Sequence, residues 1–260
     1  MSLPESSSGE AMMRAIYLII AGAIYAVFFA TFLYLIGFVA NLPYFPVTVD
    51  HGIASAPLRA PLPALIVDVA LIALFGIQHS VMARRGFKAA WTRIVPAALE
   101  RSAYVLASSL VLVVLFALWH PIAGTVWSVT NPVAAGILWV LFASGWAIVL
   151  LSTFLINHFE LFGLMQVYRH WRGHSAADPR FSQPLFYKLV RHPLYSGFLI
   201  SFWAIPVMSL GHALLAAGMS IYVVIAIRYE ERDLVELFGP DYAAYQASTG
   251  MLVPGVGKRG

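Results

Sequence analysis

Long apolar runs separated by short polar or basic segments dominate the pattern of this 260-residue chain. About 20 apolar residues in a helix cross the hydrocarbon core of a bilayer. Four runs of this length predict membrane-spanning helices, and two more that meet at Gly211 predict a hydrophobic hairpin that crosses and returns. The runs cover approximately residues 15 to 40, 64 to 82, 102 to 119, 133 to 156, 194 to 210 and 212 to 228.

Composition supports a membrane protein over a soluble one. The chain is 60% hydrophobic and 11% charged, which is more apolar than a single soluble core can bury. Cysteine is absent, and this excludes a disulfide framework, a thiolate metal site and a cysteine nucleophile. We expect an all-α polytopic integral membrane bundle of five to six spans, with residues 1–260 forming a single domain.

Basic residues are divided unequally between the polar segments. If the N-terminus lies in the cytoplasm, the lysines and arginines fall on that side and only Arg59 falls on the other. This asymmetry follows the positive-inside rule and predicts that both termini are cytoplasmic. The net charge of +4 therefore reflects topology, and we expect a lipid bilayer as the partner and no nucleic acid. We find no internal repeat of the kind that builds inverted-repeat transporters.

The polar segments predict several non-spanning structures. Residues 1–11 are small and Ser-rich, which predicts a flexible tail. Five prolines between Asn41 and Pro63 predict a loop of short turns. Residues 87–99 predict a short amphipathic helix on the membrane surface. The longest polar stretch, 157–191, predicts a cytoplasmic lid or substrate loop, and 229–260 predicts a cytoplasmic C-terminal segment.

Two polar motifs flank the hydrophobic hairpin and return to the same membrane face. They are Arg191-His192-Pro193-Leu194-Tyr195-Ser196-Gly197 and Arg228-Tyr229-Glu230-Glu231. Two cations, an imidazole and two carboxylates at one depth exceed what an anchor requires. An arginine can bind a carboxylate bidentately and a glutamate can bind an ammonium or hydroxyl groups, so we interpret the cluster as a cofactor site. The alternative is an Arg–Glu clamp that pins two helix ends together without a ligand.

Two histidines stand at the depth of this cluster. His79 ends the second apolar run, and His158-Phe159-Glu160 follows the fourth. Titratable groups beside a polar site commonly transfer protons, so His79, His158 and Glu160 are candidates for catalysis. The simpler alternatives are a helix-end histidine bonded to a backbone carbonyl and a helix cap at residues 158–160.

His170 and His174 have the i, i+4 spacing of a helical metal site. Arg169 and Arg172 lie beside them and work against a bound cation, and the chain lacks the several histidine pairs of membrane di-iron enzymes. We therefore expect no metal.

The motifs resemble the isoprenylcysteine carboxyl methyltransferase superfamily of integral membrane methyltransferases. The likeness rests on the Arg-His-Pro-x-Tyr-x-Gly run, the hairpin, the Glu-Glu pair and the segment from Phe238 to Tyr245. Within the superfamily the chain is similar to bacterial enzymes that methylate methanethiol to dimethyl sulfide. That narrower likeness is carried by residues 78–84 (Gln-His-Ser-Val-Met-Ala-Arg), 157–164 (Asn-His-Phe-Glu-Leu-Phe-Gly-Leu) and 184–245.

The resemblance implies S-adenosyl-L-methionine as methyl donor and a small thiol as acceptor, by in-line transfer to a thiolate in a bacterial inner membrane. No Gly-x-Gly-x-x-Gly turn follows a strand here, so helix ends and loops would have to hold the donor. Alternatives are methylation of a lipid or prenylated substrate by the same fold and a non-enzymatic membrane protein. Many relatives carry Gly-x-Tyr before Arg-His-Pro where this chain has Gln183-Pro184-Leu185-Phe186-Tyr187, which weakens an assignment to prenylcysteine enzymes.

The resemblance also implies the cofactor-binding residues. Two of them lie on a short C-terminal helix that would cap the pocket, although tyrosines there could instead anchor the helix to lipid headgroups. The implied residues are Arg191, His192, Tyr195, Gly197, Glu230, Glu231, Tyr242 and Tyr245.

Overall fold

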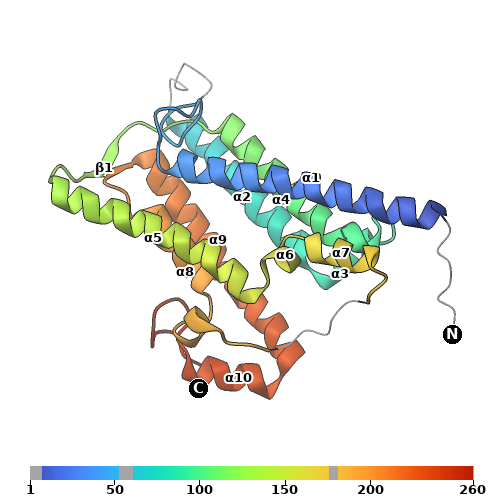
Figure 1. Cartoon of the computed structure of the whole chain (residues 1–260). Helices are drawn as coiled ribbons and strands as arrows, with labels where there is room; N and C mark the ends of the chain where they lie inside the picture. Colours follow the sequence, from blue (N-terminus) through green and yellow to red (C-terminus); the bar gives the residue numbers. More distant parts are fainter. Residues whose placement is uncertain (1–7, 53–60, 176–180, 260) are drawn as a thin grey trace.

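The computed structural model describes residues 8–52, 61–175 and 181–259. In these ranges the chain is built almost entirely from helices (Figure 1). Five helices within these ranges are long and apolar enough to cross a membrane, which confirms the all-α polytopic fold predicted from the apolar runs. They are α1 (Ser8–Val39), α2 (Pro61–Ala83), α4 (Glu100–Leu118), α5 (Pro132–Ile156) and α9 (Leu210–Phe238).

Shorter elements connect the long helices. The helical ones are α3 (Arg85–Trp91), η1 (Ala97–Leu99), α6 (His158–Leu161), α7 (Leu164–Trp171), η2 (Leu185–Lys188), α8 (Pro193–Trp203) and α10 (Pro240–Ser248). The strands β1 (Thr125–Ser128) and β2 (Val207–Ser209) form a small antiparallel pair. The surface helix expected over 87–99 is therefore divided, since α3 ends at Trp91 and a turn precedes Pro96.

The N-terminal part of the chain differs from the predicted flexible tail. Helix α1 begins at Ser8, and an i, i+4 ion pair of 3.9 Å between Glu10 and Arg14 supports its first turns. Residues 1–7 of the predicted tail lie outside the described residues. The proline-rich connection forms turns as far as residue 52, and the described chain resumes within helix α2 at Pro61.

The predicted lid over 157–191 contains two packed helices. Helix α7 lies against α1, with Val167 fully buried and the His170 ring stacked on Tyr17 at 5.7 Å between centroids. Residues 176–180 of this segment lie outside the described residues. Residues 158–171, which form α6 and α7, therefore belong to the helical body.

The hydrophobic hairpin also differs from the expected pair of runs. Its first arm, α8, ends at Trp203, and a short turn leads from there to β2. Ser209 accepts a hydrogen bond of 3.0 Å from the backbone of His212 and so begins α9. Helix α9 then continues to Phe238, beyond the expected end near 228, because residues 228–238 are mostly good helix formers. The Glu-Glu motif therefore lies inside a helix.

Helices α5 and α8 pack closely through glycines. A Cβ atom on Gly197 would lie 2.6 Å from the carbonyl oxygen of Gly145, and a Cβ on Gly145 would lie 2.7 Å from that of Gly197. Small residues at such contacts let two backbones approach. Gly197 therefore serves helix packing, and the main apolar core continues around it with Phe38, Trp119 and Phe202 almost inaccessible.

Candidate active site

The predicted polar cluster forms around Glu231, whose side chain is fully buried near the C-terminal end of α9. Its Oε1 accepts from Arg191 Nε at 2.7 Å and from His192 Nε2 at 3.1 Å. Its Oε2 accepts from Gln246 Nε2 at 3.0 Å and pairs with Arg259 at 3.3 Å. Both oxygens are thus saturated, and one carboxylate ties together α8, α9, α10 and the C-terminal segment.

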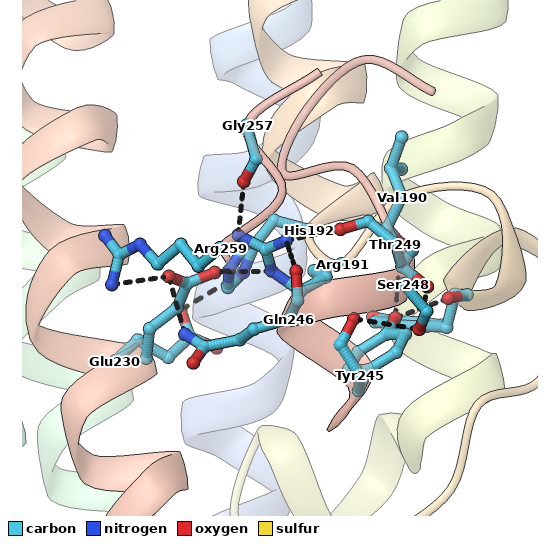
Figure 2. A network of polar contacts seen from close by, with 12 residues as sticks. Val190, Arg191, His192, Glu230, Tyr245, Gln246, Ser248, Thr249, Gly257 and Arg259 are labelled. Carbon is cyan, nitrogen blue, oxygen red and sulfur yellow. Dashed lines mark hydrogen bonds and ion pairs between the residues drawn. The ribbon is translucent and has the colours of Figure 1, made fainter. Parts of the chain in front are cut away.

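Arg191 has the geometry of a clamp (Figure 2). Beyond its bond to Glu231, its terminal nitrogens donate to the carbonyl oxygens of Gln246 at 3.2 Å, Thr249, and Gly257 at 3.1 Å. All three guanidinium nitrogens are engaged by protein, and the side chain is inaccessible. The expected bidentate contact with a ligand carboxylate would require breaking these bonds, so the geometry favours the Arg–Glu clamp raised as the alternative from the sequence.

Glu230 is the accessible carboxylate of the cluster. Its side chain is 44% exposed, whereas that of Glu231 is 0% exposed, and its Oε2 lies 3.9 Å from His192 Nδ1. Burial, followed by the charge of Glu230, raises the pKa of Tyr187. Burial and then the charges of Glu231 and Glu230 raise the pKa of Tyr242. Glu230 therefore faces protonated phenols and keeps room for an additional partner.

Tyr242 and Tyr245 share one face of α10, with ring centroids 5.8 Å apart, and both are buried in protein. Tyr245 donates to the carbonyl oxygens of Tyr187 and Val190, and burial raises its pKa to about 12. The Tyr242 hydroxyl is buried without a partner among the described residues. Burial fits the capping interpretation better than anchoring to lipid headgroups. An unpaired buried hydroxyl is costly, so Tyr242 keeps an unused hydrogen-bonding group beside Glu230.

His79 lies in an aromatic group that borders Glu230. Its ring stacks on that of Phe75, with 5.3 Å between ring centroids. The corresponding centroid distances to Tyr104 and Tyr222 are 5.0 Å and 6.1 Å. The hydroxyls of both tyrosines lie within electrostatic range of Glu230. Tyr195 contacts His192 at 5.8 Å between ring centroids and completes the connection. His79 is thus connected with the hairpin motifs through Tyr104 and Tyr222, which lie between it and Glu230.

The tyrosines from α4 and α9 were missed by sequence reasoning. Tyr104 and Tyr222 lie inside apolar runs, where an isolated tyrosine is ordinary. Because Tyr104, Tyr222 and His79 lie on three different helices, only the packing of those helices shows that the two tyrosines surround His79.

His158 and Glu160 lie in a different environment. His158 bonds Tyr25 at 2.7 Å and Thr153 at 2.8 Å, and burial lowers its pKa. Glu160 accepts from Asn157 at 2.7 Å and from Arg169 at 3.1 Å. These contacts cap and order the turn after α5, which is the simpler alternative from the sequence.

An open apolar groove of about 580 Å³ lies between α2 and α9. It is bordered near the site by Ser80 and Tyr222, and at one end Arg84 lies over the Tyr229 ring at 3.7 Å. Within the described ranges, no group of three or more His, Cys, Asp or Glu residues could hold a metal.

Comparison with known proteins identifies relatives along almost the whole chain. It is 46% identical to methanethiol S-methyltransferase 1 of Bradyrhizobium diazoefficiens over 97% of this chain and 87% of that protein. It is 46% identical to the Mycobacterium tuberculosis enzyme over 94% of this chain and 98% of that protein. It is 43% identical to the Crocosphaera subtropica enzyme over all of both chains. No family model and no solved structure matches. The chain belongs to the family of methanethiol S-methyltransferases.

Proposed function

We propose that this protein transfers the methyl group of S-adenosylmethionine to methanethiol and releases dimethyl sulfide. The relatives support an S-methyltransferase acting on methanethiol. The observation that carries the choice of donor is Glu230, an accessible carboxylate beside buried tyrosines and the unpartnered hydroxyl of Tyr242.

The side chains around Glu230 are of the types that S-adenosylmethionine needs. This molecule carries a sulfonium, an ammonium, a carboxylate, ribose hydroxyls and an adenine. Glu230 offers an anion to its cationic groups, and Tyr195 and Tyr222 offer aromatic faces. Arg259 is 53% exposed and has donors left for a carboxylate after its contact with Glu231. Among the cofactor residues expected from the sequence, Arg191, Glu231 and Tyr245 would support this site through their hydrogen bonds to the protein, and His192 lies between Glu230 and Glu231. Gly197 would contribute indirectly, by packing α8 against α5.

The pocket promotes the reaction by excluding water and by orienting the reactants. A thiolate and a sulfonium neutralise each other during methyl transfer, so side chains that keep water away make both more reactive. Holding the two reacting sulfur atoms in line can lower the activation free energy by about 7 to 11 kcal/mol. The aromatic walls around His79 suit a small apolar thiol.

We also propose the orientation and organisation of the chain in the membrane. The basic connections favour a cytoplasmic location for both termini, with the whole chain as one domain of a bacterial inner membrane. This orientation requires the arm formed by α8 and β2 to cross the membrane in addition to the five long helices. The ends of α8 and α9 that carry the cluster would then face the cytoplasm.

A second candidate is methylation of a larger lipophilic thiol or a lipid. The observation favouring it is the open apolar groove between α2 and α9, because about 580 Å³ exceeds the needs of one methanethiol molecule and an open groove can admit a long lipophilic chain.

The test is headspace gas chromatography on protein purified in detergent and supplied with S-adenosylmethionine and methanethiol. We expect dimethyl sulfide and S-adenosylhomocysteine in equal amounts, and neither product without protein. Donor binding without dimethyl sulfide would move the acceptor to a lipid or larger thiol. Absence of both binding and product would refute the proposal.

A further inference from the structure

We propose that His79 is the base that removes the thiol proton, and that Ser108 is a positioning residue that holds its ring in the required tautomer. This inference rests on the proposed function, since it concerns how the same site prepares its thiol. His79 is one of the three catalytic candidates from the sequence, beside His158 and Glu160, and Ser108 is a residue that the sequence did not indicate.

The tautomer follows from the hydrogen bonds of Ser108. Its hydroxyl has one proton, which it donates to the carbonyl oxygen of Tyr104 at 3.0 Å. Its oxygen can then only accept, from Gln78 Nε2 at 3.4 Å and from His79 Nδ1 at 3.1 Å. His79 therefore carries its proton on Nδ1. The lone pair of Nε2 remains, and no described residue donates to it.

His158 has the same tautomer for a similar reason, but its second nitrogen is occupied. Thr153 donates to the carbonyl of Leu150 at 2.6 Å and so accepts from His158 Nδ1 at 2.8 Å. His158 Nε2 then accepts from the Tyr25 hydroxyl at 2.7 Å. Its basic lone pair is thus used by the protein, and this contrast selects His79.

The surroundings of His79 suit a neutral base. Phe75 stacks on one side of the ring, and Tyr104 and Tyr222 approach from α4 and α9. The charged groups that face it are Arg101, which lies over the Tyr104 ring at 4.9 Å, and Glu230 beyond the tyrosines. No described charged group pairs with the Nε2 lone pair, so this nitrogen is free to accept a proton.

Proton transfer from the thiol to His79 needs no other reactant. The thiol S–H bond breaks, an N–H bond forms at His79 Nε2, and the electron pair stays on sulfur. The Nδ1–H bond to Ser108 persists and orients the imidazolium. The thiolate then forms its bond to the transferred methyl group, and His79 returns the proton to solvent.

Activity measurements on four variants test the roles. His79→Ala should lower kcat for methanethiol by about 10² to 10⁴, the usual contribution of a general base, while donor affinity stays unchanged. Ser108→Ala should lower kcat by about tenfold, as expected for the loss of one hydrogen bond, and Ser108→Thr should restore it. The matched control is Ser109→Ala, because Ser109 makes the same type of bond to Val105 at 2.9 Å on the same helix and has no bond to a histidine.

A pH series separates a base from a merely structural residue. As the pH rises, more methanethiol is ionised in solution and less help from a base is needed. The ratio of wild-type to His79→Ala rates should therefore shrink at alkaline pH. A ratio that stays constant across the series would overturn the assignment.

The tautomer has a readout that needs no activity. Nitrogen NMR of histidine-labelled protein should show the His79 proton on Nδ1 in the wild type and in Ser109→Ala, and a mixture of tautomers in Ser108→Ala. Observation of Nε2–H in the wild type, or equal activity losses in Ser108→Ala and Ser109→Ala, would overturn the proposal. A wild-type protein that makes no dimethyl sulfide would refute the proposed function instead, and the NMR result would still stand.

Discussion

Replacement of Arg191 tests whether the cluster is held by a clamp. Arg191→Ala leaves the carboxylate of Glu231 buried without its main cation and removes the donor from the carbonyls of Gln246, Thr249 and Gly257. Removing one partner of a buried ion pair costs about 3 to 5 kcal/mol. For a chain of this length that corresponds to a fall in unfolding temperature of roughly 6 to 20 °C.

The matched control is Arg85→Ala. Arg85 pairs with Glu236 at 3.3 Å, but these side chains are 67% and 55% exposed, and such a pair contributes about 0 to 1 kcal/mol. Thermal unfolding of both variants in one detergent, followed by circular dichroism, provides the comparison. If Arg191→Ala unfolds at the temperature of Arg85→Ala while donor binding is abolished, Arg191 is a ligand residue and the clamp is wrong.

Three further predictions concern packing, a phenol and pH. Gly197→Ala places a Cβ against α5 and should destabilise the protein by about 1 to 3 kcal/mol, whereas Gly136→Ala, with open space around it, should not; chemical denaturation measures both. Tyr245→Phe removes a donor from two carbonyls and should cost about 1 to 3 kcal/mol in the same assay, and an unchanged midpoint would contradict the capping role. Burial lowers the pKa of His158 below its ordinary 6.5, so the folded state resists protonation there. Stability from this residue is present above pH 6.5 and lost below it, and the fall in unfolding temperature in acid should be smaller in His158→Asn.

The long helices could be predicted from the sequence because spanning a bilayer is a local requirement on apolar length. The end of α9 could not, since hydropathy stops at the membrane surface while the helix continues through Arg228 to Phe238. The β1–β2 pair was equally hidden. Thr125 and Ser209 are far apart in the chain, and their short segments pair only after the helices are assembled.

The residue types of the site could be predicted, but the division of roles among them could not. Adjacent glutamates look alike in a sequence, yet Glu231 points into the protein and Glu230 toward accessible space. The resemblance implied Gly197 as a cofactor-binding residue, yet the backbone that lies against it is that of Gly145. Such distinctions depend on which partners tertiary packing supplies.

The central claim is that Glu230 marks the methyl-donor site, and isothermal titration calorimetry of S-adenosylmethionine tests it most directly. Glu230→Gln removes one charged contact worth about 1.5 to 3 kcal/mol, so the Kd should rise by roughly 10-fold to 150-fold with an unchanged unfolding temperature. Glu236→Gln, an exposed carboxylate on the same helix, should bind as the wild type does. Equal affinity in Glu230→Gln and the wild type would contradict the account and place the donor elsewhere.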